Sequence, residues 1–118
     1  MKYMLLIHQG TTPTPPSEAW DNLPEDEKGA VYAAYRAINE TPGVTSGLQL
    51  SPPETATTVR VADGKTLTTD GPFVEIKEAI GGYLLFEADD LDAAIELASQ
   101  IPAARLGGAI EVRPIVEW

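Results

Sequence analysis

The most informative part of the chain is residues 69–82, which read Thr69-Asp70-Gly71-Pro72-Phe73-Val74-Glu75-Ile76-Lys77-Glu78-Ala79-Ile80-Gly81-Gly82. This stretch opens with a tight turn, because Pro72 has a fixed φ that suits the second position of a turn beginning at Gly71. The Asp70 carboxylate can accept hydrogen bonds from backbone N–H groups of that turn. It is therefore either a structural cap or an acid held in position beside a cleft.

Working outward from this turn, six segments predict strands. Residues 2–8 and 82–88 are apolar on both faces, which is typical of central strands. Residues 44–50 contain Gly47 and residues 109–118 contain Pro114, so both predict edge strands. Residues 57–62 and 65–69 flank Asp63-Gly64, a strong hairpin turn. With two helices between the strands, this order predicts an α+β, ferredoxin-like βαββαβ sandwich of strand order 4-1-3-2 with an added β-hairpin.

Two helices and a shorter helical turn are expected. Residues 17–22 predict the short turn, which carries Trp20. The main helix should begin near Pro24, with Asn22 as its cap, and should end before Pro42-Gly43. Its apolar face repeats at Val31, Ala34, Tyr35 and Ile38, and we interpret Tyr32 and Tyr35 as core or rim aromatics. Asp89 or Asp90 should cap the second helix, whose expected buried face is Leu91, Ala94, Ile95, Ala98 and Ile101.

This architecture predicts a homodimer. Two helices can cover only one face of the sheet, yet both central strands are apolar on both faces. A second copy related by two-fold symmetry is the simplest cover for the other face. We expect that interface to exceed roughly 1,200 Å² in total.

Composition narrows the function classes. The 118 residues are 43% hydrophobic and form one expected domain, residues 1–118. The net charge of −10 argues against nucleic-acid binding, which needs a basic patch, and favours a solvated acidic face. The chain has no cysteine and one histidine, so we expect no thiol chemistry, no metal site and no cofactor. The apolar start is too short for a signal peptide or a membrane span, and we expect a cytoplasmic protein.

A candidate site follows from the expected sheet. His8 ends the first strand, and Gly82 begins the antiparallel neighbour, so the turn at Asp70 should reach the same end of the sheet. We predict that Asp70 and His8 are catalytic and that Phe73, Tyr83 and Arg105 bind a ligand. A carboxylate beside an imidazole can orient it and raise its pKa, as general base chemistry requires. The same proximity would also suit a structural hydrogen bond.

Several strings in order give the chain a specific resemblance: Asp70-Gly71-Pro72-Phe73, Lys77-Glu78, Gly81-Gly82-Tyr83, Ala56-Thr57-Thr58-Val59-Arg60, Ile101-Pro102-Ala103-Ala104-Arg105 and Glu111-Val112-Arg113-Pro114. Together they resemble the DGPF-domain branch of the YCII-related proteins. The resemblance implies a ferredoxin-like domain that forms a dimeric α+β barrel, with no settled activity. Some members are linked to extracytoplasmic-function sigma factors. The family histidine of the first helix has no counterpart between Pro24 and Glu40, which leaves His8 as the only substitute.

Three functions remain open from the sequence. The first is a small-molecule-binding protein or enzyme with a cleft near the Asp70 turn. The second is a regulatory interaction module that uses its acidic surface, for example with a sigma factor. The third is a structural homodimer without a ligand. A deep pocket would favour the first, and a flat acidic face would favour the second.

Overall fold

A four-stranded antiparallel sheet carries most of the chain in the computed structural model, which describes residues 1–15, 17–52, 55–70 and 80–117. The sheet consists of β1 (Lys2–His8), β2 (Val44–Gln49), β5 (Ile80–Glu87) and β6 (Ala109–Pro114), in the order β2-β5-β1-β6. The two strands that are apolar on both faces, β1 and β5, are central, as predicted. This α+β arrangement is consistent with the ferredoxin-like order 4-1-3-2.

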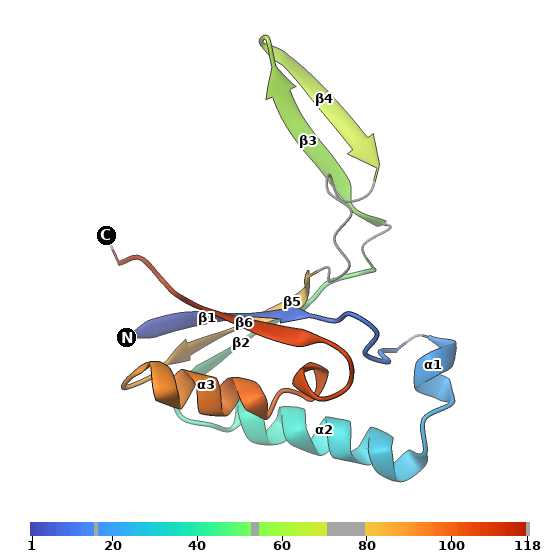
Figure 1. The fold of residues 1–118 in the computed structure, drawn as a ribbon, viewed down its shortest axis with the longest axis vertical. Helices are drawn as coiled ribbons and strands as arrows, with labels where there is room; N and C mark the ends of the chain where they lie inside the picture. Colours follow the sequence, from blue (N-terminus) through green and yellow to red (C-terminus); the bar gives the residue numbers. More distant parts are fainter. Residues whose placement is uncertain (16, 53–54, 71–79, 118) are drawn as a thin grey trace.

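The helices lie on one side of this sheet (Figure 1). They are α1 (Glu18–Asp21), α2 (Glu25–Asn39) and α3 (Leu91–Ser99), and the 3₁₀ turn η2 (Pro102–Ala104) follows α3. Ser17 caps α1 through its side chain, which accepts a hydrogen bond from the Trp20 N–H. Asn22 does not cap α2 as predicted, because it ends α1, and α2 instead begins after Pro24 without a side-chain cap.

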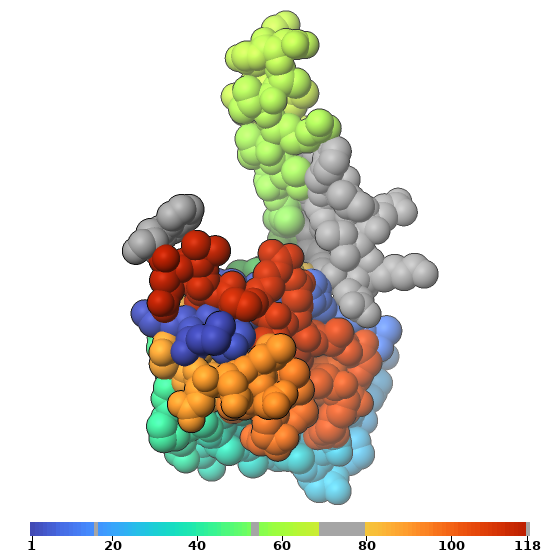
Figure 2. All heavy atoms as spheres, turned by 60° about the vertical axis from the view of Figure 1, so that its left-hand side comes forward, coloured from blue at the N-terminus to red at the C-terminus, as the bar shows by residue number. Residues whose placement is uncertain are grey.

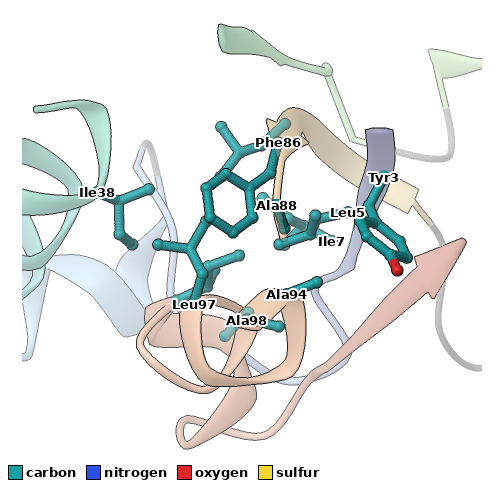
Figure 3. Close-up of a cluster of buried hydrophobic side chains, with 12 residues drawn as sticks. Tyr3, Leu5, Ile7, Ile38, Phe86, Ala88, Ala94, Leu97 and Ala98 are labelled. Atoms are coloured by element: carbon teal, nitrogen blue, oxygen red, sulfur yellow. The ribbon is translucent and has the colours of Figure 1, made fainter. Parts of the chain in front are cut away.

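The core is the layer between the sheet and these helices (Figure 3). From the sheet, Tyr3, Leu5 and Ile7 of β1 and Leu84 and Phe86 of β5 point into it. The helices add Ile38 of α2 and Ala94, Leu97 and Ala98 of α3. Alternate residues of each central strand thus share one buried face, which we call the helix face.

The buried stripe of α3 differs from the expected one. Ala94, Ala98 and, beyond the helix, Ile101 are buried as predicted, but Leu91 and Ile95 are 49% and 50% exposed. Leu97 takes their place in the core. The stripe is therefore rotated toward 94, 97, 98 and 101, where two alanines let the helix lie close to the sheet. Asp90 caps α3, because its carboxylate accepts the Ala93 N–H at 2.9 Å.

Two strand boundaries differ from the predicted ones by two residues or more. β6 ends at Pro114 instead of continuing to Trp118, since proline has no N–H to extend the ladder. β5 begins at Ile80 instead of Gly82, and His8 pairs with Ile80 across a register shift in β1. Both differences fall at strand ends and leave the predicted topology intact.

The added hairpin is formed by β3 (Thr57–Ala62) and β4 (Lys65–Asp70). Asp63 and Gly64 both have positive φ, 52° and 73°, as a two-residue type I′ turn requires. The hairpin stands away from the sheet, on the side opposite the helices (Figures 1 and 2). It explains a radius of gyration of 16.2 Å, against about 13.5 Å for a compact chain of this length.

Candidate functional site

A cavity of about 280 Å³ lies on the helix face, between the sheet, α2 and the loop that follows β1. Its wall combines residues from β1, α1, α2, β2, β5, η2 and the loop 12–15. The cavity also borders the start of β5, where Gly82 and Tyr83 line it. It therefore lies at the end of the sheet for which the sequence predicted a site.

Most of the wall is aliphatic. Ile7 and Leu84, neighbours on β1 and β5, form the sheet side, and Val31 of α2 faces them. Leu48, Pro102 and Leu106 complete the aliphatic part. Such a surface favours an apolar ligand body, because contact with it removes apolar area from water on both sides.

Three aromatic side chains add to the wall from α1 and α2. Trp20 is buried, and its ring meets Tyr32 edge-on, with centroids 5.6 Å apart and planes at 80°. Tyr35, one turn further along α2, is half-buried. Burial raises the pKa of the Tyr35 phenol above its ordinary value, so the hydroxyl is protonated at neutral pH and can donate a hydrogen bond.

Polar groups occupy defined places around this apolar wall. Ser46 of β2 donates to the Asn39 carbonyl Oδ1 of α2 at 2.8 Å, which orients that amide and leaves its NH₂ as a donor. Thr12, in the loop after β1, has a buried Oγ1 with no hydrogen-bond partner among the described residues. That oxygen is shielded from solvent, so Thr12 lines the cavity without offering its hydroxyl to a molecule bound there.

Tyr83 lies against the edge strand because β2 has a glycine there. A methyl group on Gly47 would come within 2.6 Å of the Tyr83 ring. Only glycine permits this approach without displacing the ring or the strand. Gly47, which predicted an edge strand, thus also has a packing role at the cavity.

The charge of the wall contrasts with the charge of the protein. The chain has eight basic and 18 acidic residues, yet none of them, and not His8, is among the described residues that line the cavity. The ionisable side chains of this wall are tyrosine phenols. The site thus offers neutral hydrogen-bonding groups on an apolar surface.

His8, predicted as catalytic, projects from the other face of the sheet. It follows Ile7, whose side chain is in the core, and consecutive strand residues point to opposite faces. The His8 Nε2 lies 3.2 Å from Glu111 Oε1, and Glu111 also accepts a hydrogen bond from Arg113. These two hydrogen bonds, first that from His8, lower the pKa of the Glu111 carboxyl.

The predicted pairing of His8 with Asp70 is not tested. The backbone of Asp70 ends β4, opposite Thr57, but its side chain lies outside the described residues, and so does Phe73. Arg105, predicted at the margin of a ligand site, pairs with Glu27 of α2 at 2.7 Å. That exposed ion pair links η2 to α2, while the next residue, Leu106, lines the cavity.

The family model for the YCII-related domain matches residues 1–118. The chain belongs to the YCII-related family. An uncharacterised protein of Rhizobium meliloti (strain 1021) is 32% identical over 118 residues, which cover 98% of this chain and 92% of that relative. The family assignment confirms the resemblance seen in the sequence at the level of the YCII-related group.

For most residues that line the cavity of this YCII-related chain, the sequence alone carries weaker signals. It indicates a core or rim aromatic at Tyr35 and contains no motif that assigns Trp20, Asn39 or Ser46 to a site. A signal did exist, because Val31, Tyr35 and Asn39 recur every four residues and so share one face of α2. Along this face the side chains change from the aliphatic Val31 to the aromatic Tyr35 and the amide Asn39, which indicates a helix surface that becomes polar toward its C-terminal end.

Two further observations bear on the class of site. Across the described ranges, no three histidine, cysteine or acidic side chains come together as a metal site would need. None of the described helices combines the length and apolar content needed to cross a membrane.

Proposed function

We propose that this YCII-related protein binds a small molecule in the cavity on the helix face of its sheet. The observation that carries the proposal is the cavity itself, which combines an apolar and aromatic wall with a few fixed polar groups. Ligand sites in proteins have this composition. Trp20 and Tyr35 would contact the ligand body, and Asn39 and Ser46 would orient it from the rim.

The proposal includes membership of the DGPF branch, which the string Asp70-Gly71-Pro72-Phe73 supports. It also includes a homodimer of the dimeric α+β barrel type. Support for the homodimer comes from the face of the sheet opposite the helices, which we call the open face. There, Met4, Leu6 and Leu85 are only partly covered by the rest of the chain. A second copy packed on the open face would bury them without blocking the helix-face cavity.

The hairpin supports the same assembly. Val59, Val61 and Leu67 are 58%, 70% and 49% exposed, and a two-stranded hairpin alone is marginally stable in water. It stands on the open side of the sheet, beside the surface a second copy would cover (Figure 1). Contact with that copy would stabilise it.

The predicted catalytic roles of Asp70 and His8 are a separate part of the proposal. His8 is directed away from the helix-face cavity and contacts Glu111, which favours a structural or interface role for its imidazole. A reaction in the cavity would instead draw on the Tyr35 phenol. Asp70→Asn and Phe73→Ala, each tested for ligand binding and melting temperature, separate a site role from a turn role.

The test is a thermal-shift screen of neutral and charged metabolites with a matched pair of variants. Ser46→Phe places a ring at the cavity wall, whereas Ser99→Phe makes the same change on the exposed side of α3. A ligand that binds only the folded state raises the melting temperature. We expect hits that Ser99→Phe retains and Ser46→Phe loses. Hits unaffected by Ser46→Phe would contradict the cavity as the site.

A further inference from the structure

We infer that the helix-face cavity selects an uncharged aromatic molecule with a neutral hydrogen-bonding group, such as a primary carboxamide, over anions and cations of the same shape. This inference rests on the proposed function and names the ligand class for that site.

The charge of the wall is the first argument. No carboxylate, ammonium, guanidinium or imidazole occurs among the described residues that line the cavity. A charged ligand would lose its hydration on entry and find no counter-ion on these residues, a cost of at least tenfold in affinity. A neutral ligand loses only hydrogen bonds that the wall can replace.

The net charge of the whole protein does not change this preference for an uncharged ligand. The chain carries a net charge of −10, which repels anions and attracts cations to its exterior. Cation attraction of that kind is long-range and screened by salt. A cation would thus associate with the surface in low salt, and inside the cavity it would find cation–π contact with aromatic rings but no carboxylate on the described wall.

The shape of the wall favours an aromatic ring. Trp20 and Tyr32 are already packed edge to face, and Tyr35 lies on the same side of α2. A planar ligand could add to this group in offset or edge-on contact while its other side meets Leu84 and Ile7. A volume of about 280 Å³ is large enough for a single substituted ring.

The polar groups favour a ligand that both donates and accepts. Asn39 has its carbonyl engaged by Ser46 and its NH₂ available as a donor, and the Tyr35 phenol can also donate. The Ser46 hydroxyl, which donates its proton to Asn39, can still accept a hydrogen bond through its oxygen. A carboxamide matches this set with its oxygen and its NH₂, and it carries no charge.

The experiment uses three probes of nearly equal size and shape: benzamide, benzoate and benzamidinium. Each is titrated into the ¹⁵N-labelled full chain at neutral pH and moderate salt, and amide shifts are followed at Gly47, Gly82 and Leu106 around the cavity. We expect benzamide to shift these amides with an affinity at least tenfold above that of either charged probe. Equal or tighter binding of benzoate or benzamidinium at the same amides would overturn the ligand class.

Two outcomes separate this inference from the proposed function. If a charged probe binds in the cavity and benzamide does not, the site stands and the ligand class fails. If none of the three shifts the cavity amides and the metabolite screen also gives no hit sensitive to Ser46→Phe, the proposed function fails, and this inference with it.

A matched pair of variants tests the charge argument directly. Leu48→Lys introduces a cation at an exposed position of the wall, and Leu91→Lys does the same on α3, away from the cavity. Leu48→Lys should raise the benzoate-to-benzamide affinity ratio about fivefold or more, and Leu91→Lys should leave it unchanged. An equal change in both variants would show that overall charge sets the preference, and would overturn the inference.

Tyr35→Phe tests the hydrogen-bonding part of the argument. The change removes one hydroxyl and keeps the ring, so the fold should persist. Benzamide affinity should fall about threefold to tenfold while toluene, which has no polar group, binds the variant as well as the parent protein. An equal loss for both probes would show that the ring position moved and that the phenol does not select the carboxamide.

Discussion

The two faces of the sheet are built from alternate residues of the same strands, yet they have different surroundings. Leu5 on the helix face is fully buried under α2 and α3, whereas its neighbour Leu6 on the open face is partly exposed. Both are leucines in one central strand, so the strand itself does not explain the difference. The helices explain the difference, because they cover only one face of the sheet (Figure 1).

The comparison shows what an apolar strand pattern can and cannot tell. A strand that is apolar on both faces indicates two buried faces, but it does not say whether helices or another copy of the chain covers each one. Here the helix face also encloses a cavity, while the open face offers an apolar surface beside the hairpin. In our account the first binds a ligand and the second binds a partner copy.

The largest expected effect comes from truncating the two neighbouring leucines. Leu5→Ala should lower the free energy of unfolding by about 2–5 kcal/mol, because it leaves a cavity in the core. Leu6→Ala should cost clearly less at low protein concentration and more at high concentration, because the proposed partner copy would cover that face. Denaturant unfolding at two protein concentrations measures both. Equal, concentration-independent losses would remove the distinction between the faces.

The next effect concerns assembly. Leu6→Glu places a charge on the open face, and we expect it to weaken the proposed homodimer by at least about tenfold in Kd, because the interface would bury an unpaired carboxylate. Leu91→Glu, on the exposed side of α3, is the matched control. Sedimentation of both variants and the parent protein gives the answer. A parent protein that is monomeric at micromolar concentration would contradict the dimer.

A smaller effect is expected from alkaline pH at the helix face. Burial raises the folded pKa of Tyr35, whereas the unfolded chain has the ordinary pKa near 10. The resulting stability is fully present below about pH 10 and is lost as pH rises through the folded pKa. Tyr35→Phe should therefore lose less stability than the parent protein between about pH 9 and 11. Tyr32→Phe, at a 57% exposed position, is the control for removing a phenol from α2.

The smallest effect is expected from acid pH at the open face. Hydrogen bonds from His8 and Arg113 lower the folded pKa of Glu111, so its contribution to stability is present at neutral pH and is lost as pH falls through that lowered pKa. Glu111→Gln should slightly flatten the acid limb of the unfolding free energy, whereas Glu96→Gln on α3 should not. A steeper acid limb in Glu111→Gln would show that the sign is wrong.

The topology could be predicted from the sequence because β1 and β5 carry continuous apolar runs and the edge strands carry breakers. The Asp63-Gly64 hairpin could be predicted because its turn needs two positive φ angles. The buried side of α3 could not be predicted, because Leu91, Ile95 and Leu97 are all apolar. Packing against the sheet decides which of them is buried. The site that the sequence predicted at this end of the sheet stays a prediction, and Tyr83, one of its expected residues, lines the cavity.

Most of the cavity could not be predicted, for a physical reason. Its wall draws one or a few residues from each of several elements, and no short motif connects Thr12, Trp20, Tyr35 and Ser46. Their convergence depends on how α2 lies against the sheet. The face of the sheet to which His8 points could be predicted. Ile7 belongs to an apolar run that faces the core, and consecutive strand residues point to opposite faces.

The most direct test of the account is to locate a bound ligand. Crystals of the protein soaked in 4-bromobenzamide would show an anomalous bromine peak at the bound ring. We predict a peak inside the helix-face cavity, between Tyr35 and Leu84, that is lost in Ser46→Phe crystals and kept in Ser99→Phe crystals. A peak on the open face over Leu6 and Leu85 with none in the cavity would contradict the central claim.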